Sequence, residues 1–334
     1  MTRERKTGRS IALPEPPSAV RDAALALAAG APEPARFGRV LAGTAGWTDP
    51  TLLKTEFYPR RARDPAGRLA YYATQFGLVE VDATYYTLLA RETVGRWVTV
   101  TPADFCFDVK AHAALTGHPI DITKLPRELK AEYASLGARV YRDRAPLELV
   151  SALERRFVES LQPLRESGRL RTVLCQFPPW FGATRGNARS LEALRERFED
   201  LPLSVEFRNS SWLAGERSER VFDLLARNRF SYVCVDEPHG AARGVPPVAR
   251  VTNPELAVIR MHGQNREGWE RRGATVLERF NYLYAPEELA AWLPSVRRLA
   301  DEARSVHVVF NNCVRDYAVI NAKGLIALLA AARE

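Results

Sequence analysis

The sequence has few of the residues that mark disulfide-stapled domains and metal clusters. Its 334 residues include four cysteines, five histidines and two methionines, and no two cysteines form a CxxC pair. We therefore expect reduced thiols in a cytoplasmic protein. Long hydrophobic runs are also missing. The clearest uncharged apolar stretches, Ala23 to Ala31 and Gly324 to Ala332, are far shorter than the roughly 20 residues of a membrane span, so no membrane partner is expected.

The excess of charge of one sign is small. Lys and Arg number 48 against 40 Asp and Glu, which gives a formal net charge of +8. Such an excess favours anionic partners in general, and nucleic acid is a possible partner without being indicated by a dedicated basic segment. Hydrophobic residues make up 46% and charged residues 26%, which is typical of a globular protein. No pattern points to an oligomeric state.

Residues 1–36 differ in composition from the rest of the chain. We expect a partly disordered N-terminal extension that contains one short helix across Ala19 to Ala29, followed by a single domain over residues 37–334. The extension is rich in proline, with Pro14, Pro16, Pro17, Pro32 and Pro34.

From residue 39 onward, short β-rich apolar runs alternate with segments of helical character. Alternating strands and helices imply a parallel sheet with right-handed crossovers, and eight such units predict a TIM (β/α)8 barrel in the α/β class. An open doubly wound sheet is the alternative, but the first turn, GTAGW, is neither a GxGxxG motif nor a P-loop. The eight predicted strands are residues 39–47, 78–86, 104–112, 171–181, 203–212, 231–238, 256–263 and 305–312.

Two connections between these strands are long, residues 113–170 and 264–304. In a TIM barrel the segments that follow strand C-termini surround the active-site mouth, so we expect both connections to wall or cover it. The helices predicted most clearly are Ser190 to Phe198, Glu216 to Asn228 and Pro286 to Arg304.

Ionisable side chains gather near the C-terminal ends of the predicted strands. Period-two spacing places Glu206 with Arg208, and Arg260 with His262, on one face of their strands. Buried charges must pair or bind something, so these groups predict either a functional pocket or a structural network of ion pairs. With the amide side chains at the same strand ends included, the full set is Glu80, Asp82, Asp108, Lys110, His112, Gln176, Glu206, Arg208, Asp236, Glu237, Arg260, His262, Asn311 and Asn312.

The same stretches resemble the domain of unknown function 72 family, the YecE-like TIM barrels. The resemblance runs from about residue 40 to 330 through GTAGW, FYP, VEVDATYY, FDVKAH, QFPPWF, VEFRNSSW, VDEP, RMHG, FNN and AVINAKGL. It implies a TIM barrel with a polar pocket and no settled activity. This chain departs from the family pattern at Asp82, where Asn is usual, at Asn209, where His is usual, and at Cys313, where Asp is usual.

These residues support an enzyme acting on a small anionic substrate or phosphodiester. Guanidinium and ammonium groups would hold phosphate oxygens, while Glu80 or Glu206 would act as general base and His262 as general acid or ligand. The candidate catalytic residues are Glu80, Lys110, Glu206, Asp236 and His262. The candidate substrate-binding residues are Asp82, Tyr85, Gln176, Arg208, Trp212, Arg260, Asn311 and Asn312.

Three alternatives accompany this hypothesis. A divalent metal, not favoured because three cations share the pocket, would use Glu80, His112, Glu206, Asp236 and His262. A lyase would form a Schiff base on Lys110, although neighbouring carboxylates oppose the required loss of its proton. A non-enzymatic barrel related to nucleic-acid binding or repair would stack bases on a rim of aromatic residues, namely Trp47, Tyr85, Tyr86, Trp180, Trp212 and Trp269.

Overall fold

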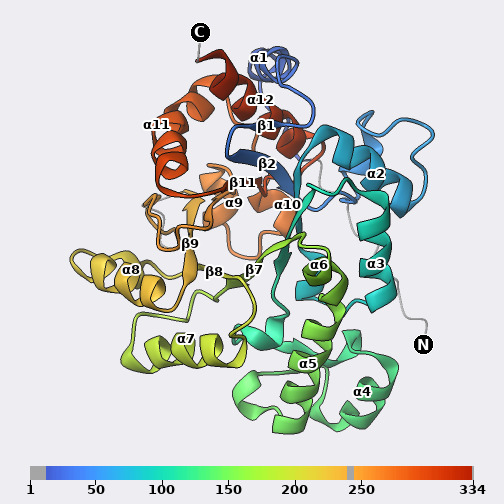
Figure 1. Cartoon of the computed structure of the whole chain (residues 1–334), viewed down its shortest axis with the longest axis vertical. Helices are drawn as coiled ribbons and strands as arrows, with labels where there is room; N and C mark the ends of the chain where they lie inside the picture. Colours follow the sequence, from blue (N-terminus) through green and yellow to red (C-terminus); the bar gives the residue numbers. More distant parts are fainter. Residues whose placement is uncertain (1–12, 239–243, 333–334) are drawn as a thin grey trace, which may run out of the picture.

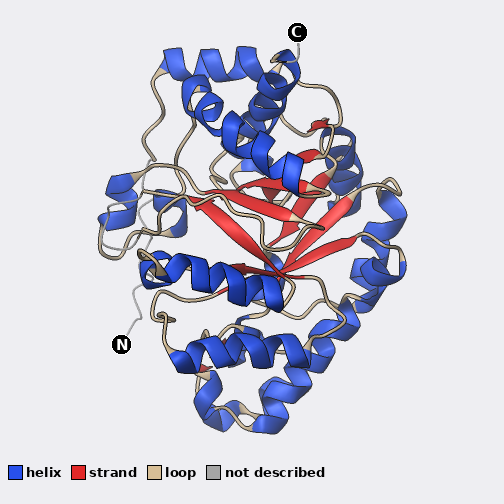
Figure 2. Ribbon diagram, turned by 60° about the vertical axis from the view of Figure 1, so that its left-hand side comes forward, coloured by secondary structure: helices blue, strands red, loops and turns tan. Residues whose placement is uncertain are grey.

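The computed structural model describes residues 13–238 and 244–332 and has a closed barrel of eight parallel strands at its centre (Figures 1 and 2). β11 pairs with β2, which closes the barrel and excludes the open sheet. The predicted TIM barrel is therefore confirmed. In their order around the barrel, the strands are β2 (Val40–Ala45), β3 (Leu78–Val81), β4 (Cys106–Lys110), β7 (Leu170–Gln176), β8 (Leu203–Glu206), β9 (Phe230–Asp236), β10 (Ala257–Met261) and β11 (Val306–Phe310).

Each of the eight predicted runs overlaps one of these strands, and β7 and β9 begin one residue before their predicted runs. Strands buried on both faces need apolar residues at successive positions, and every residue of β9 and β10 is buried. The observed strands end earlier than the predicted runs, so that Arg208 and His262 lie just beyond the last residues of β8 and β10. The charged residues thus lie both within the last residues of the strands, as Glu206 and Arg260 do, and just beyond them.

Helices surround the barrel and cover its outer face (Figure 2). The predicted helices correspond to α7, α8 and α11. In α8, Val221, Phe222 and Leu225 form the buried face expected of an amphipathic helix. The helices are α1 (Ser18–Ala28), α2 (Pro65–Gln75), α3 (Arg91–Val100), α4 (Arg127–Glu132), α5 (Leu147–Ser160), α6 (Gln162–Glu166), α7 (Arg185–Arg197), α8 (Arg217–Arg227), α9 (Arg266–Glu270), α10 (Val276–Arg279), α11 (Pro286–Glu302) and α12 (Tyr317–Ala331).

The two short apolar stretches noted in the sequence pack against each other through α1 and α12 (Figure 1). Ala24 and Ala28 of α1 are buried in one cluster with Ile320 of α12. Gly324 allows this close approach, because a Cβ at that position would lie 3.3 Å from the side chain of Leu27. The predicted helix in the extension is therefore present and docked on the barrel domain, whereas residues 1–12, where we expect disorder, lie outside the described residues.

Both long connections contain structure of their own. Residues 113–170 hold α4, α5, α6 and the small antiparallel pair of β5 (Ile120–Asp121) and β6 (Arg139–Val140), and they form the lobe at the bottom of Figure 1. Residues 264–304 hold α9, α10 and α11. A further two-residue strand, β1 (Arg36–Phe37), pairs antiparallel with β2. Among the described residues, no helix combines the length and apolar character needed to cross a bilayer.

Candidate functional site

The centre of the candidate site is a buried arginine held between two carboxylates. Arg260 of β10 donates to Glu206 of β8 and to Glu80 of β3, each at 2.5 Å. All three side chains are at most 1% exposed. Although burial alone lowers the pKa of Arg260, the two carboxylates outweigh burial and raise it. This central triad ties together strands from opposite parts of the barrel.

The two carboxylates of the triad differ in their surroundings. Burial raises the pKa of Glu80 to about 8, and the cations near it only partly oppose this shift. Burial also acts on Glu206, but Arg208 and Arg260 together hold its pKa well below the usual range. Glu206 is thus ionised at neutral pH, because it faces two guanidinium groups.

Arg208 lies directly above the triad. Its Nε contacts the Glu206 carboxylate, and its Nη1 donates to Glu237 at 2.5 Å. Its Nη2 lies 2.9 Å from Nε2 of His262. Burial and the charge of Arg208 lower the pKa of His262 to about 3, so this imidazole is neutral. On its other side, Nδ1 of His262 lies 3.0 Å from the amide of Asn311.

The triad forms one charged cluster with Asp82, Lys110, Arg208 and His262. The groups of this cluster that reach solvent are Asp82, Lys110 and Arg208. Their side chains are 32%, 13% and 10% exposed, whereas Glu80, Glu206, Arg260 and His262 are covered. Lys110 lies 3.4 Å from Asp82. Although burial raises the pKa of Asp82, the charges of Lys110 and Arg260 outweigh it and lower this pKa.

Aromatic rings enclose these exposed groups. Lys110 lies 5.1 Å from the centre of the Tyr85 ring, and Arg208 lies 5.5 Å from that of Trp269 in α9. Phe280, which follows α10, packs against His262 with ring centres 5.6 Å apart. The connection of residues 264–304 therefore covers the mouth of the barrel, as the sequence predicts.

His118 is a site residue that the sequence reasoning missed. It follows β4, and its ring packs edge-on against Tyr85 and Trp180, with centres 5.2 and 5.9 Å away. Burial, followed by the charges of Lys110 and Arg208, lowers the pKa of His118 to about 4. The charges of Lys110 and Arg208 thus both act on the ring of His118. The prediction that residues 113–170 cover the mouth pointed to this segment, but no motif singled out the histidine.

Several predicted site residues make their contacts outside the charged cluster. Asp236 accepts hydrogen bonds from Tyr284 and from Gln264, and Glu237, the next residue, is the one that contacts Arg208. Trp212 is 2% exposed and donates to the carbonyl of Phe181.

Asn312 donates to Asn321 of α12 and to the carbonyl of Tyr282, so it fastens α12 to the barrel. Gln176 ends β7 in register with Glu206, at the rim of the cluster.

The residues considered for a divalent metal do not form a ligand set. Arg260 occupies the space between Glu80 and Glu206, and a guanidinium there repels a cation. His112 is not part of this cluster, because its Nδ1 accepts from the backbone of Ala114 at 3.3 Å. Among the described residues, no group of three or more His, Cys, Asp and Glu side chains suits a metal ion.

A largely apolar cavity of about 620 Å³ opens beside the exposed groups. Asp82 and Asn311 lie on its wall, together with Trp47, Trp97 and Phe280. Cys313 also lines it, but burial raises the pKa of this thiol well above its usual value, which opposes a role as nucleophile. The cavity is of the size that encloses the organic part of a small ligand.

The comparisons with known proteins agree with this architecture. The family model described as "Protein of unknown function DUF72" matches residues 41–334. The UPF0759 protein YunF of Bacillus subtilis is 30% identical over 290 residues, which cover 86% of this chain and 93% of that protein.

Two crystal structures of DUF72 family proteins show the same fold. The one from Enterococcus faecalis V583 has a TM-score of 0.71 and 30% identity, and covers 87% of this chain and 95% of its own. The one from Thermotoga maritima MSB8 has a TM-score of 0.68 and 30% identity, over 88% and 99% of the two chains. With its predicted resemblance thus confirmed, this chain belongs to the DUF72 family.

Proposed function

We propose that this protein is an enzyme acting on a small phosphoester at the C-terminal mouth of the barrel. The phosphate group binds Lys110 and Arg208, and the organic part lies in the apolar cavity beside Asp82. The observation that carries this proposal is the division of the cluster: two cations and one carboxylate reach solvent, while the remaining charges are paired beneath them. A ligand entering the mouth therefore meets two cationic side chains beside one carboxylate.

Arg208 has donors left for such a ligand. Of its five N–H groups, three are directed to Glu206, Glu237 and His262, so two remain for phosphate oxygens. The carboxylates also fix the plane of the guanidinium before the ligand arrives. A preorganised cation of this kind stabilises charge that develops in the transition state, which is the largest contribution in many enzymes.

Asp82 is the carboxylate placed to act as general base. Its lowered pKa keeps it ionised, and it lies beside Lys110 on the wall of the cavity. Glu80 and Glu206 are buried behind Arg260, so they act as positioning residues and do not touch the substrate. Lys110 is best suited to charge stabilisation, since it forms an ion pair with Asp82 and lies over the ring of Tyr85.

Binding of inorganic phosphate provides the first test. In thermal unfolding at low ionic strength, phosphate should raise the melting temperature of the wild-type chain and not that of Lys110→Met. The matched control is Lys130→Met, which removes the same charge from an exposed position on α4 and should respond like the wild type. No saturable effect of phosphate, or an equal loss of binding in both variants, would refute the site.

Turnover is tested with p-nitrophenyl phosphate and bis(p-nitrophenyl) phosphate. For whichever ester is cleaved, Lys110→Met should lower kcat by about 10² or more, in line with the loss of one transition-state contact. Asp82→Asn, which introduces the residue usual in the family pattern, should lower kcat by about 10² to 10⁴ if Asp82 removes a proton. Full turnover of Asp82→Asn would show that another group is the base.

A further inference from the structure

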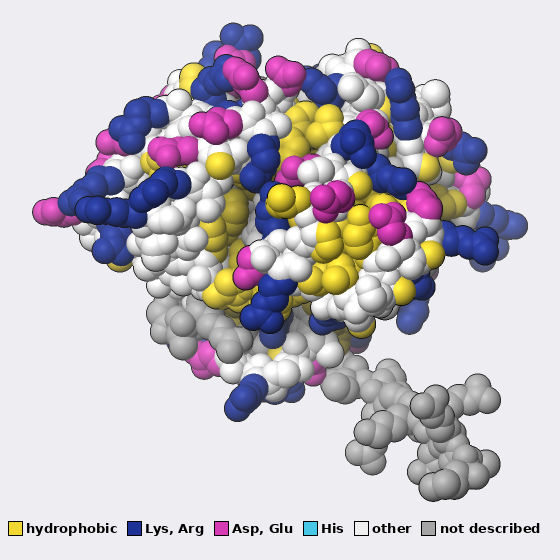
Figure 3. Space-filling model, turned by 90° about the horizontal axis from the view of Figure 1, so that it is seen from below, with side chains coloured by type: hydrophobic (Ala, Val, Ile, Leu, Met, Phe, Trp, Pro, Cys, Tyr) yellow, Lys and Arg dark blue, Asp and Glu magenta, His cyan; other side chains and the backbone are white. Residues whose placement is uncertain are grey.

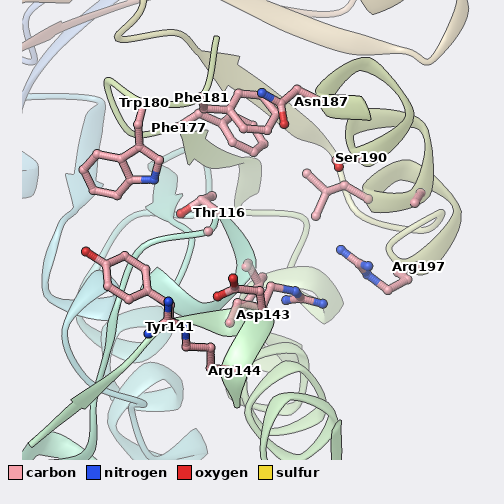
Figure 4. A pocket seen from close by; sticks show the side chains of 15 residues that line it. Thr116, Tyr141, Asp143, Arg144, Phe177, Trp180, Phe181, Asn187, Ser190 and Arg197 are labelled. Carbon is pink, nitrogen blue, oxygen red and sulfur yellow. The ribbon is translucent and has the colours of Figure 1, made fainter. Parts of the chain in front are cut away.

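A second cavity, of about 730 Å³, lies outside the barrel between α7 and the beginning of the 113–170 lobe (Figure 4). None of its described lining residues belongs to the charged cluster at the barrel mouth. We infer that this cavity is a separate binding site for a ligand of the nucleotide class, in which a sugar joins a planar base to a phosphate group. The inference goes beyond the proposed function and uses different residues.

One wall of the cavity offers a rigid aromatic face. Trp180 is 59% exposed, and the Pro178–Pro179 pair precedes it. The backbone on either side of Trp180 is fixed, because Asn209 donates to the carbonyl of Pro179 at 2.6 Å and Trp212 donates to that of Phe181 at 2.6 Å. A large ring that is held in place and yet left open to solvent is suited to stacking on a planar ligand.

Tyr141 extends this aromatic face on the side of the lobe. It is 46% exposed, and its ring centre lies 6.4 Å from that of Trp180, with the two planes at 71°. Figure 4 shows the two rings on opposite sides of one end of the cavity, with Phe177 and Phe181 beside Trp180. The rings thus form an angled recess that a nucleobase can enter.

The opposite wall carries an excess of positive charge. Arg142 and Arg197 share one carboxylate, that of Glu154, at 2.8 and 3.6 Å. Burial and the charge of Arg142 lower the pKa of Arg197, which indicates that one carboxylate does not neutralise both guanidinium groups. Arg144 is exposed and its side chain makes no hydrogen bond or ion pair with the described residues. Asp143 is the nearby acid on this wall.

The guanidinium donors that remain match a phosphate. Arg197 contacts Glu154 through Nε alone, so both of its terminal amino groups remain available, as do those of Arg144. Arginine binds phosphate oxygens in pairs of parallel hydrogen bonds. In Figure 4, Arg197 lies across the cavity from Trp180, whereas Arg144 lies beside Tyr141. The face seen in Figure 3 has apolar hollows bordered by Lys and Arg together with Asp and Glu. The ring and the phosphate of one ligand would therefore contact opposite walls.

The probe for this site is AMP, titrated into the full chain at about 50 mM salt and followed by calorimetry and tryptophan fluorescence. AMP should bind more tightly than adenosine or inorganic phosphate, since it alone engages both walls. Trp180→Ala should weaken AMP about fivefold or more, and Trp180→Phe less. Arg144→Gln combined with Arg197→Gln should weaken it about tenfold or more.

Two controls separate this site from the barrel mouth. Arg220→Gln removes an equivalent charge from an exposed position on α8 and should leave AMP binding unchanged. Because AMP is itself a phosphoester and would also bind the proposed site at the barrel mouth, the cavity variants are compared in the Lys110→Met background, where AMP binding to this cavity should persist. The inference is overturned if AMP shows no saturable binding up to millimolar concentrations, if phosphate alone binds as tightly, or if Lys110→Met abolishes AMP binding while the arginine variants do not.

Discussion

Removal of Arg260 is the perturbation whose effect follows most directly from the structure. In Arg260→Met, two buried carboxylates lose the cation that each contacts at 2.5 Å. Glu206 keeps Arg208 as a partner, but Glu80 is left in an apolar interior with no direct ion pair. Breaking a buried pair in this way costs about 3 to 5 kcal/mol of unfolding free energy, because an uncompensated charge remains.

The loss should depend on pH with a definite sign. Without Arg260, the folded-state pKa of Glu80 rises further above the unfolded value of about 4.5, and that of Glu206 rises from its lowered value, so the folded variant binds protons that the unfolded chain releases. Its stability is then fully present below the unfolded pKa and falls as pH rises. In the wild type, Glu206 behaves oppositely, because its pKa is lowered. The difference in stability between the two proteins should therefore be larger at pH 8 than at pH 5.

Denaturant unfolding at pH 5, 6.5 and 8 measures this difference. Arg304→Met is the surface control, since its ion pair with Glu255 is largely exposed and should leave the midpoint almost unchanged. If Arg260→Met does not fold at pH 8, the double variant with Glu80→Leu should regain folding, because the unpaired carboxylate is then absent. A loss below about 1 kcal/mol, or one that is independent of pH, would refute the account of the triad.

Two further predictions concern the periphery of the site and of the fold. His118→Phe should make stability less dependent on pH between 4 and 6.5. The folded-state pKa of His118 is about 4, so in the wild type its contribution to the stability of the fold is lost as pH falls from 6.5. The unfolding midpoint of the variant relative to wild type should therefore rise on acidification. Gly324→Leu should lower the melting temperature, because the new side chain pushes α1 away from α12. Gly38→Leu is the control, since Gly38 has open space around it but a positive φ, and it tests whether backbone strain alone has that effect. An equal fall of the melting temperature in both variants would contradict the packing argument.

The fold was predictable because its signal is repeated eight times. Each apolar run marks a strand, and the lengths between runs require crossovers, so an error in one element would not have changed the architecture. The ends of strands were harder to place. Arg208 and His262 lie beyond the last ladder residues of β8 and β10, although the residue pattern continues through them.

The candidate site was predictable in composition but not in its pairing. Glu80, Lys110, Glu206, Arg208, Arg260 and His262 converge at one end of the barrel, as the strand-end pattern indicates. The choice between Asp236 and Glu237 depends on the register of β9, where Asp236 is opposite Met261. A shift by one residue exchanges the two faces of a strand, and a single sequence does not fix that register. His118 was missed for a related reason, since only the folded lobe brings it to Tyr85.

The arrangement of charges explains why so many ionisable groups are compatible with a stable barrel. In the charged cluster, Glu80 and Glu206 bind the guanidinium of Arg260, and Glu206 and Glu237 hold the guanidinium of Arg208 in a fixed plane. The desolvation cost is thereby compensated below the mouth, and the groups above it need no conformational change to meet a ligand. If this is correct, Glu206→Gln should weaken phosphate binding by disordering Arg208, and it should do so although Glu206 itself does not touch phosphate.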